Sequence, residues 1–154
     1  EAAAWAKDTM GLTLYEWLQQ LYVKYGFYRE SLVSLVLKGM DGAEQIQKMM
    51  IDFRANPPKA LAGSEVITVR DYKTLEETNL QSGEVAHIDQ DSSNVLQWIT
   101  ADGSIISVRP SGTEPKIKFY FGVKEPLASV EEFEAVEAKL DAKIEQIKKD
   151  LNLI

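Results

Sequence analysis

Cysteine is absent from this sequence of 154 residues, and histidine occurs only once. Without cysteine, the chain has no disulfide bonds, no thiolate nucleophile and no cysteine-ligated zinc. The single histidine, His87, stands in no pattern from which a catalytic triad can be assigned. We therefore interpret His87 as a surface or structural residue.

Basic side chains and long apolar runs are also scarce. The chain has 17 lysine and arginine residues against 24 acidic ones, which gives a net charge of −7. Proteins that bind nucleic acids or anionic membranes in general need a basic surface, so this balance argues against both. No apolar run approaches the roughly 18 residues of a membrane span, and no segment resembles a signal peptide. We expect a soluble, cytoplasmic protein without nucleic-acid or membrane partners.

The first residues lack both an initiator methionine and a residue that could cap a helix. Residues 1–7 are nevertheless strong helix formers. Removal of an affinity tag would explain such a start. We expect instead that the sequence is a piece of a longer protein.

Helical periodicity occurs in three further segments. In the first, Thr13 and Glu16 form a capping-box pattern, apolar residues recur on one face, and Gly26 predicts the end of the helix. The second helix is predicted to begin at Asp41 and to end before a pair of prolines. The third is predicted to begin at a Ser129 cap and to run for about six turns at 3.6 residues per turn.

Strand patterns fill much of the remaining sequence. We predict strands over residues 31–37, 65–72, 94–100, 104–109 and 116–123, the last from its strict alternation of apolar and polar side chains. Asp102-Gly103 predicts a two-residue type I′ turn. Residues 73–93 are polar and have no clear period. Helices and antiparallel strands that occur in separate groups predict an α+β domain, which begins near residue 30.

The segment Arg109-Pro-Ser-Gly-Thr-Glu-Pro-Lys116 lies between two predicted strands and differs from the rest of the chain. Two prolines stiffen it, and Gly112 allows a backbone turn that is closed to other residues. A guanidinium, two hydroxyl groups and the amides around Gly112 are a set that can surround a phosphate. Residues 105–124 carry four basic side chains against one acidic, in an otherwise acidic protein. The residues alone leave two interpretations open, a site for a small anion and a rigid hairpin connection with solvated charges.

Other candidate sites are weaker. Residues 89–93 resemble a calcium-binding loop, but Asn94 replaces the expected glycine and Thr100 the closing glutamate. The carboxylates of the last predicted helix fall mostly on its solvent side. We assign no metal site and no catalytic residue from these patterns.

The phosphate-binding loop in the C-terminal domain of the α-D-phosphohexomutases closely resembles residues 108–118, Val-Arg-Pro-Ser-Gly-Thr-Glu-Pro-Lys-Ile-Lys. Similarity to the phosphoglucomutase and phosphomannomutase branch of this family extends to residues 1–7, 14–16, 25–28 and 42–44, and it is least clear over residues 73–93. The alternative within the family is a phosphoglucosamine mutase, whose loop is similar. The alternative from another class is a stand-alone, non-catalytic phosphate-binding module.

The resemblance implies a fold and a domain division. Family members have four domains, and the last has a TBP-like α+β fold, an antiparallel sheet with helices packed on one side. Residues 1–26 would then be the closing helices of the third domain, and residues 27–154 the fourth, phosphate-binding domain. The family's phosphoserine loop, aspartate-rich metal loop and sugar-recognising loop have no counterpart in this sequence. The resemblance therefore implies a chain that is inactive alone, with Mg²⁺ bound elsewhere in the full-length enzyme.

The resemblance also implies a reaction and a set of ligands. The family's enzymes are intramolecular phosphotransferases that interconvert hexose 1-phosphates and hexose 6-phosphates through a phosphoserine and a 1,6-bisphosphate. The C-terminal loop holds the phosphate that is not reacting. Carried over by position, the phosphate ligands are Arg109, Ser111, Gly112, Thr113 and Lys118. The implied partners are glucose or mannose phosphates and the remaining domains of the same enzyme.

Overall fold

The structure is a computed structural model that describes residues 1–37 and 41–154. Over these ranges the helices are α1 (Ala2–Met10), α2 (Leu14–Tyr25), α3 (Gly42–Ala55) and α4 (Phe133–Asp150), with the 3₁₀ turn η1 (Val130–Glu132) directly before α4. The strands are β1 (Phe27–Val36), β2 (Ala60–Leu61), β3 (Ser64–Asp71), β4 (Glu76–Asn79), β5 (Val85–His87), β6 (Leu96–Thr100), β7 (Ile105–Pro110) and β8 (Lys116–Glu125).

One antiparallel sheet connects these strands in the order β1-β8-β7-β6-β3-β4-β5, and β2 pairs with the free part of β3. The long strands β1 and β8 pair from Phe27 opposite Glu125 to Val36 opposite Lys116. In the register of β7 with β8, Arg109 lies directly opposite Lys118. Side chains that lie opposite each other in a sheet point to the same face, so this register decides which residues can act together.

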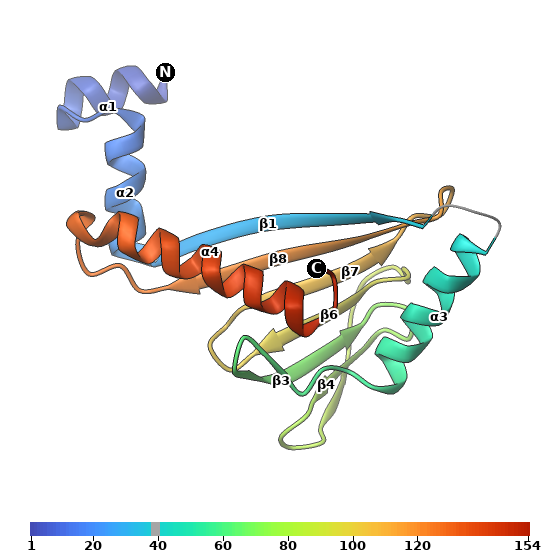
Figure 1. Ribbon diagram of the computed structural model, residues 1–154. Coiled ribbons are helices and arrows are strands. Elements are labelled where there is room, and N and C mark those ends of the chain that lie inside the picture. The colour runs from blue at the N-terminus through green and yellow to red at the C-terminus, as the bar shows by residue number, and fades with distance from the viewer. Residues whose placement is uncertain (38–40) are drawn as a thin grey trace.

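The alternation of β8 separates a buried face of the sheet from an open one. Ile117, Phe119, Phe121 and Val123 are at most 1% exposed and form part of the core. Helices α3 and α4 both cover this face (Figure 1). An aromatic contact between Phe53 of α3 and Phe119 of β8, with ring centroids 6.1 Å apart, ties α3 to it. The prediction of an α+β fold, with an antiparallel sheet and helices packed on one side, is confirmed.

The two N-terminal helices lie at one end of the sheet (Figure 1). The predicted capping box at the start of α2 is confirmed, because the Glu16 N–H donates to the Thr13 hydroxyl and the Thr13 N–H donates to the Glu16 carboxylate, at 3.2 and 2.7 Å. Gly26, at φ 96°, ends α2 as predicted, since few other residues adopt this backbone conformation.

Aromatic rings attach α2 to the rest of the fold. Tyr22 stacks on Phe27 of β1, and Phe27 stacks on Phe133 of α4, with centroid distances of 4.4 and 4.6 Å. The contact of α1 with α2 includes Trp5 and Trp17, whose centroids are 5.2 Å apart. Assignment of residues 1–26 to a preceding domain stays a prediction.

Three local predictions need correction. The polar stretch over residues 73–93 contains two short strands, β4 and β5, and β1 begins at Phe27 instead of residue 31. Ser129 precedes the last helix as predicted but makes no side-chain capping bond. Its hydroxyl instead lowers the pKa of Glu131 through a hydrogen bond, and the chain enters α4 through the 3₁₀ turn η1.

The predicted type I′ turn at Asp102-Gly103 is also wrong. Only Gly103, at φ 81°, has a positive φ there, whereas a type I′ turn needs two such residues. The loop has three residues, closed by hydrogen bonds from Thr100 N to Ser104 O and from Gly103 N to Thr100 O at 3.0 and 2.8 Å. The Asp102 carboxylate fixes this shape, because it accepts hydrogen bonds from Thr100 Oγ1 at 2.6 Å and from Ser104 N at 3.0 Å.

Candidate functional site

The loop over residues 111–115 connects β7 to β8 and is held by its own hydrogen bonds. Ser111 N donates to Lys116 O at 2.7 Å, which closes the loop across its base. Ser111 Oγ accepts from the backbone N–H groups of Thr113 and Glu114, at 3.4 and 3.3 Å. The Ser111 hydroxyl proton makes no hydrogen bond within the described residues and stays available for a ligand.

Gly112 has a different role from the one predicted. Its φ does not lie in the left-handed region, so the loop does not need glycine for its backbone conformation. The turn is shaped instead by the two hydrogen bonds that the Ser111 hydroxyl oxygen accepts and by the two flanking prolines. A Cβ built on Gly112 would meet no atom within 4 Å. The glycine therefore leaves open space in which a ligand can approach the backbone closely.

Helix α3 supports the loop from the buried side of the sheet. Pro115 O accepts a hydrogen bond of 2.9 Å from Leu37 N. Gly42, the first residue of α3, packs so tightly that a Cβ there would lie 2.1 Å from Leu37 O and 3.3 Å from Pro115 Cβ. The loop is thus fixed both by its own bonds and by the contacts of Pro115 with Leu37 and Gly42.

A cavity of about 250 Å³ lies beside the loop on the open face of the sheet, and we call it the phosphate cavity. Its lining is formed by Arg109, Pro110, Ser111, Gly112, Lys116, Lys118 and Tyr120. The structure therefore brings together four of the five predicted ligands. Thr113 does not line this cavity; together with Ser111 and Gly112 it lines a neighbouring cavity of about 400 Å³ between the loop and α3.

Positive charge dominates the phosphate cavity. Lys116 pairs with Glu114, and this contact with Lys116 lowers the pKa of Glu114, so that the carboxylate stays ionised. In the part of the chain that the structure describes, neither Arg109 nor Lys118 forms an ion pair. Two cations on neighbouring strands thus face one cavity without a partner, an arrangement that favours an anion.

Sequence reasoning did not assign Tyr120 and Lys116 to the site. Both lie on the same face of β8 as Lys118, because their positions differ from it by two residues. The alternation of β8 was visible in the sequence. It could have identified Tyr120 as a lining residue once Arg109 was placed opposite Lys118.

The remaining candidates form no comparable site. His87 is exposed on β5, and residues 89–93 lie in an exposed connection. Over residues 1–37 and 41–154, no group of three or more histidine, aspartate or glutamate side chains could hold a metal ion. No helix in the same ranges is long and apolar enough to cross a membrane.

Comparisons with known proteins agree on one family. Residues 67–140 match the model of the phosphoglucomutase/phosphomannomutase C-terminal domain. Phosphoglucomutases of Staphylococcus aureus strains MRSA252 and N315 are 38% and 37% identical over 134 residues, which cover 87% of this chain and 23% of each relative. The chain thus spans about a quarter of the length of these curated relatives.

A solved structure of the exocytosis-sensitive phosphoprotein pp63/parafusin, a phosphoglucomutase from Paramecium in its open form, is 17% identical to this chain. The match has a TM-score of 0.44 and covers 90% of this chain and 23% of that one. This likeness is too weak to support a conclusion by itself.

Proposed function

This chain corresponds to a C-terminal part of a phosphohexomutase, and from that premise we propose that it supplies the substrate-phosphate site of a phosphoglucomutase or phosphomannomutase. The full-length enzyme interconverts hexose 1-phosphates and hexose 6-phosphates through a phosphoserine and a bisphosphorylated intermediate. The loop over residues 111–115 holds whichever phosphate is not reacting. One anion site thereby serves both orientations of the intermediate.

The observation that carries this proposal is the pair of unpartnered cations in the phosphate cavity. Arg109 and Lys118 lie opposite each other on β7 and β8 and face the same space as Ser111 and Gly112. A hairpin connection that served only to reverse the chain would not need two cations on one face of the sheet. An ordered loop beside two such cations supports a binding role.

Each ligand contributes differently. The planar fork of Arg109 can donate two parallel hydrogen bonds to two phosphate oxygens, whereas Lys118 acts as a compact charge. Ser111 can donate its hydroxyl proton, and Gly112 leaves the backbone amides accessible. Thr113 acts indirectly, because its backbone N–H orients the Ser111 oxygen.

None of these groups forms or breaks a covalent bond in the proposed reaction. Their role is to bind and orient the substrate, so that the reacting phosphate reaches the serine in another part of the enzyme. The described residues do not fit a metal site. We propose that the ligands of the expected Mg²⁺ belong to the rest of the enzyme, and we assign no step of this chain to the metal.

Titration of the 154-residue chain with inorganic phosphate tests the site directly. We expect the amide NMR signals of Ser111, Gly112 and Thr113 to shift first. Arg109→Ala should weaken binding by about ten- to a hundredfold, the usual cost of losing a charge-assisted contact. Lys59→Ala removes an exposed charge elsewhere and should change the affinity less than twofold. Phosphate affinity within twofold of the wild type in Arg109→Ala would reject the assignment.

The parent reading frame separates the enzyme from a stand-alone binding module. A phosphoserine loop and an aspartate-rich loop encoded upstream of residue 1 would support a mutase. Coupled assays of that full-length protein on glucose 1-phosphate, mannose 1-phosphate and glucosamine 1-phosphate would then identify the substrate. The 154-residue chain alone should turn over none of them, because phosphoryl transfer depends on those missing parts.

A further inference from the structure

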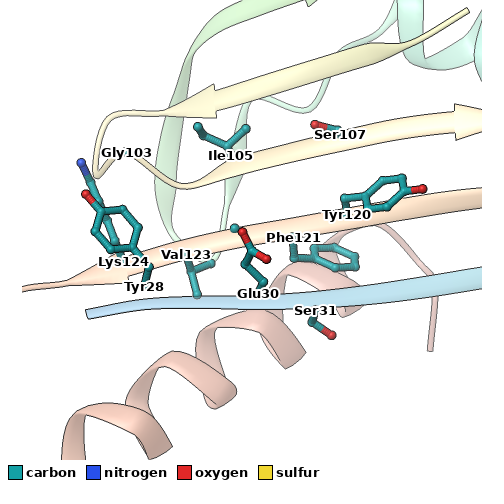
Figure 2. Close-up of a pocket in the computed structure, with 11 residues that line it drawn as sticks. Tyr28, Glu30, Ser31, Gly103, Ile105, Ser107, Tyr120, Phe121, Val123 and Lys124 are labelled. Atoms are coloured by element: carbon teal, nitrogen blue, oxygen red, sulfur yellow. The ribbon is translucent and has the colours of Figure 1, made fainter. Parts of the chain in front are cut away.

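Tyr120 lies between the phosphate cavity and a second cavity on the open face of the sheet, of about 310 Å³, which we call the groove (Figure 2). The residue lines both cavities. It is 40% exposed, and its hydroxyl makes no hydrogen bond within the part of the chain that the structure describes. The proposed function gives this hydroxyl no role.

The direction of the Tyr120 side chain places its hydroxyl on the phosphate side. Figure 2 shows the hydroxyl pointing away from Lys124, which lies at the other end of the groove. This direction leads toward Lys118, which lies two residues away on the same face of β8, a distance of about 7 Å along the strand. The loop over residues 111–115 adjoins the opposite end of the phosphate cavity. An anion held by Arg109 and Lys118 therefore has the loop on one side and the Tyr120 hydroxyl on the other.

Neighbouring side chains confine the Tyr120 ring across the sheet. Ser107 of β7 lies opposite Tyr120 on one side, and Leu32 of β1 lies opposite it on the other. Ser107 is itself held in place, because its hydroxyl accepts a hydrogen bond from Gln97 Nε2 at 2.9 Å, and Gln97 Oε1 accepts one from Arg70 Nη1 at 3.1 Å. Side chains in strands lean along the strand direction, so the ring stays oriented along β8 toward the phosphate cavity.

A phenolic hydroxyl adds something that the other groups of the cavity do not supply. Arg109 and Lys118 attract an anion through their charges, and salt weakens such an attraction. The tyrosine hydroxyl donates one hydrogen bond without carrying a charge. It acts only on an anion in direct contact, and dissolved ions do not screen that contact. The two kinds of contribution can therefore be separated by experiment.

We propose that Tyr120 is a further ligand of the phosphate site, whose hydroxyl donates a hydrogen bond to the bound anion from the side opposite the loop. This inference rests on the proposed phosphate site and deepens it. The residue lies outside residues 108–118, the segment that carries the resemblance to the phosphate-binding loop. The anion is then held by the loop, by the cations of β7 and β8, and by a neutral donor at the border of the groove.

The substitution Tyr120→Phe tests this role, because it removes the hydroxyl and keeps the ring. Methyl phosphate is the probe, since it has no polar group besides the phosphate. We expect the affinity of the 154-residue chain, measured by calorimetry, to fall about three- to tenfold, the usual worth of one hydrogen bond. In the wild-type chain, the ring NMR signals of Tyr120 should shift when methyl phosphate is added.

Tyr28→Phe is the matched control. Tyr28 is also exposed on the open face of the sheet, but it lines the groove and not the phosphate cavity. Its substitution should change the affinity for methyl phosphate less than twofold, and its ring signals should stay in place during the titration. Equal losses of affinity in Tyr28→Phe and Tyr120→Phe would overturn the proposal.

Ionic strength separates direct contact from an indirect effect. If the hydroxyl touches the anion, Tyr120→Phe should lose the same factor in affinity at low and at high salt, although binding as a whole weakens. If Tyr120 instead acted by holding the charge of Lys118 in place, the loss would shrink in high salt. That result would overturn the direct contact.

Failure of this inference can be told apart from failure of the phosphate site. If methyl phosphate does not bind the wild-type chain, the phosphate site itself is wrong and the role of Tyr120 fails with it. If Arg109→Ala weakens binding as expected but Tyr120→Phe stays within twofold of the wild type, the phosphate site stands and the role of Tyr120 is overturned.

Discussion

Charged side chains are arranged differently at the two ends of the β7–β8 pair. At the loop end, Arg109 and Lys118 are without ion-pair partners in the described residues and border an open cavity. At the other end, Lys143 of α4 reaches Asp102 at 2.8 Å and Glu125 at 3.6 Å. The Lys143 side chain is only 11% exposed. The β7–β8 pair thus has Arg109 and Lys118 without ion-pair partners at one end, whereas at the other end Glu125 of β8 and Asp102 of the β6–β7 connection share the Lys143 cation of α4.

Solvent access explains this difference. A charge that is mostly buried is costly unless it is paired, so Lys143 needs the two carboxylates that surround it. Arg109 is exposed and well hydrated, so it gains little from a permanent partner and loses little without one. The paired end stabilises the fold, and the unpaired end keeps its charges available for an anion. Four predictions test this division, in order of decreasing effect.

Arg109→Ala in the full-length enzyme should have the largest effect. We expect kcat/KM to fall about ten- to a hundredfold in both reaction directions, because each half-reaction uses the same contact. Arg109→Lys should recover only part of the loss, since it keeps the charge without the planar fork. Coupled assays in both directions give the ratio of the kcat/KM of each variant to that of the wild type. Arg109 should contribute little to folding. Loss of thermal stability in the 154-residue chain carrying Arg109→Ala would therefore contradict the idea that the loop end serves binding and the other end serves stability.

Lys143→Met should show the opposite pattern. The substitution keeps most of the side-chain length but leaves Asp102 and Glu125 without their shared cation, which should cost about 1–2 kcal/mol of unfolding free energy. Urea denaturation followed by circular dichroism measures this value. Lys148→Met is a suitable control on the same helix, since its partner Glu145 is half exposed. Weakened binding of methyl phosphate in Lys143→Met would show that the two ends are not independent.

Asp102 should make the stability of the chain depend on pH. Burial raises the pKa of Asp102, but hydrogen bonds from Lys143, Thr100 and Ser104 outweigh it and hold the pKa well below its ordinary value. A carboxylate of this kind stabilises the fold above its unfolded-state pKa of about 4, and the contribution is lost as the pH falls below that value.

Comparison with Asp102→Asn isolates this contribution. The wild-type chain should be more stable than Asp102→Asn by about 1 kcal/mol at pH 7, the worth of a charged hydrogen bond at a partly exposed site. The difference should shrink as the pH is lowered below about 4. Denaturation at a series of pH values gives both curves, and a constant difference from pH 7 to pH 3 would refute the role of the carboxylate.

Glu114→Gln should have the smallest effect. The substitution releases Lys116 from its ion pair beside the phosphate cavity and removes a negative charge from the loop. Phosphate affinity should rise about twofold at low salt, and the gain should disappear in high salt because exposed charges are screened. Titration at two ionic strengths is the measurement. A loss of affinity would indicate that Glu114 supports the loop and does not merely compete for Lys116.

Elements with strong local patterns could be predicted from the sequence. The alternation of β8 and the capping box of α2 agree with the structure, because both depend on residues a few positions apart. Strands β4 and β5 could not be predicted in this way. Both are short, β4 is polar throughout, and contacts across strands, such as the ion pair of Arg70 with Glu77 of β4, contribute to holding them. The three-residue turn around Asp102 similarly depends on side-chain bonds that a dipeptide pattern does not reveal.

The candidate site could likewise be predicted only in part from the sequence. The sequence by itself determined that a guanidinium, hydroxyl groups and a glycine are gathered into one stiff loop, because they are consecutive in the chain. Only the tertiary structure decided that Arg109 and Lys118 share a cavity, that Tyr120 also lines it, and that Thr113 lines a neighbouring one. The physical reason is the pairing of strands, since register and pleat bring distant residues to one face of a sheet, and neither is set by neighbours in the chain.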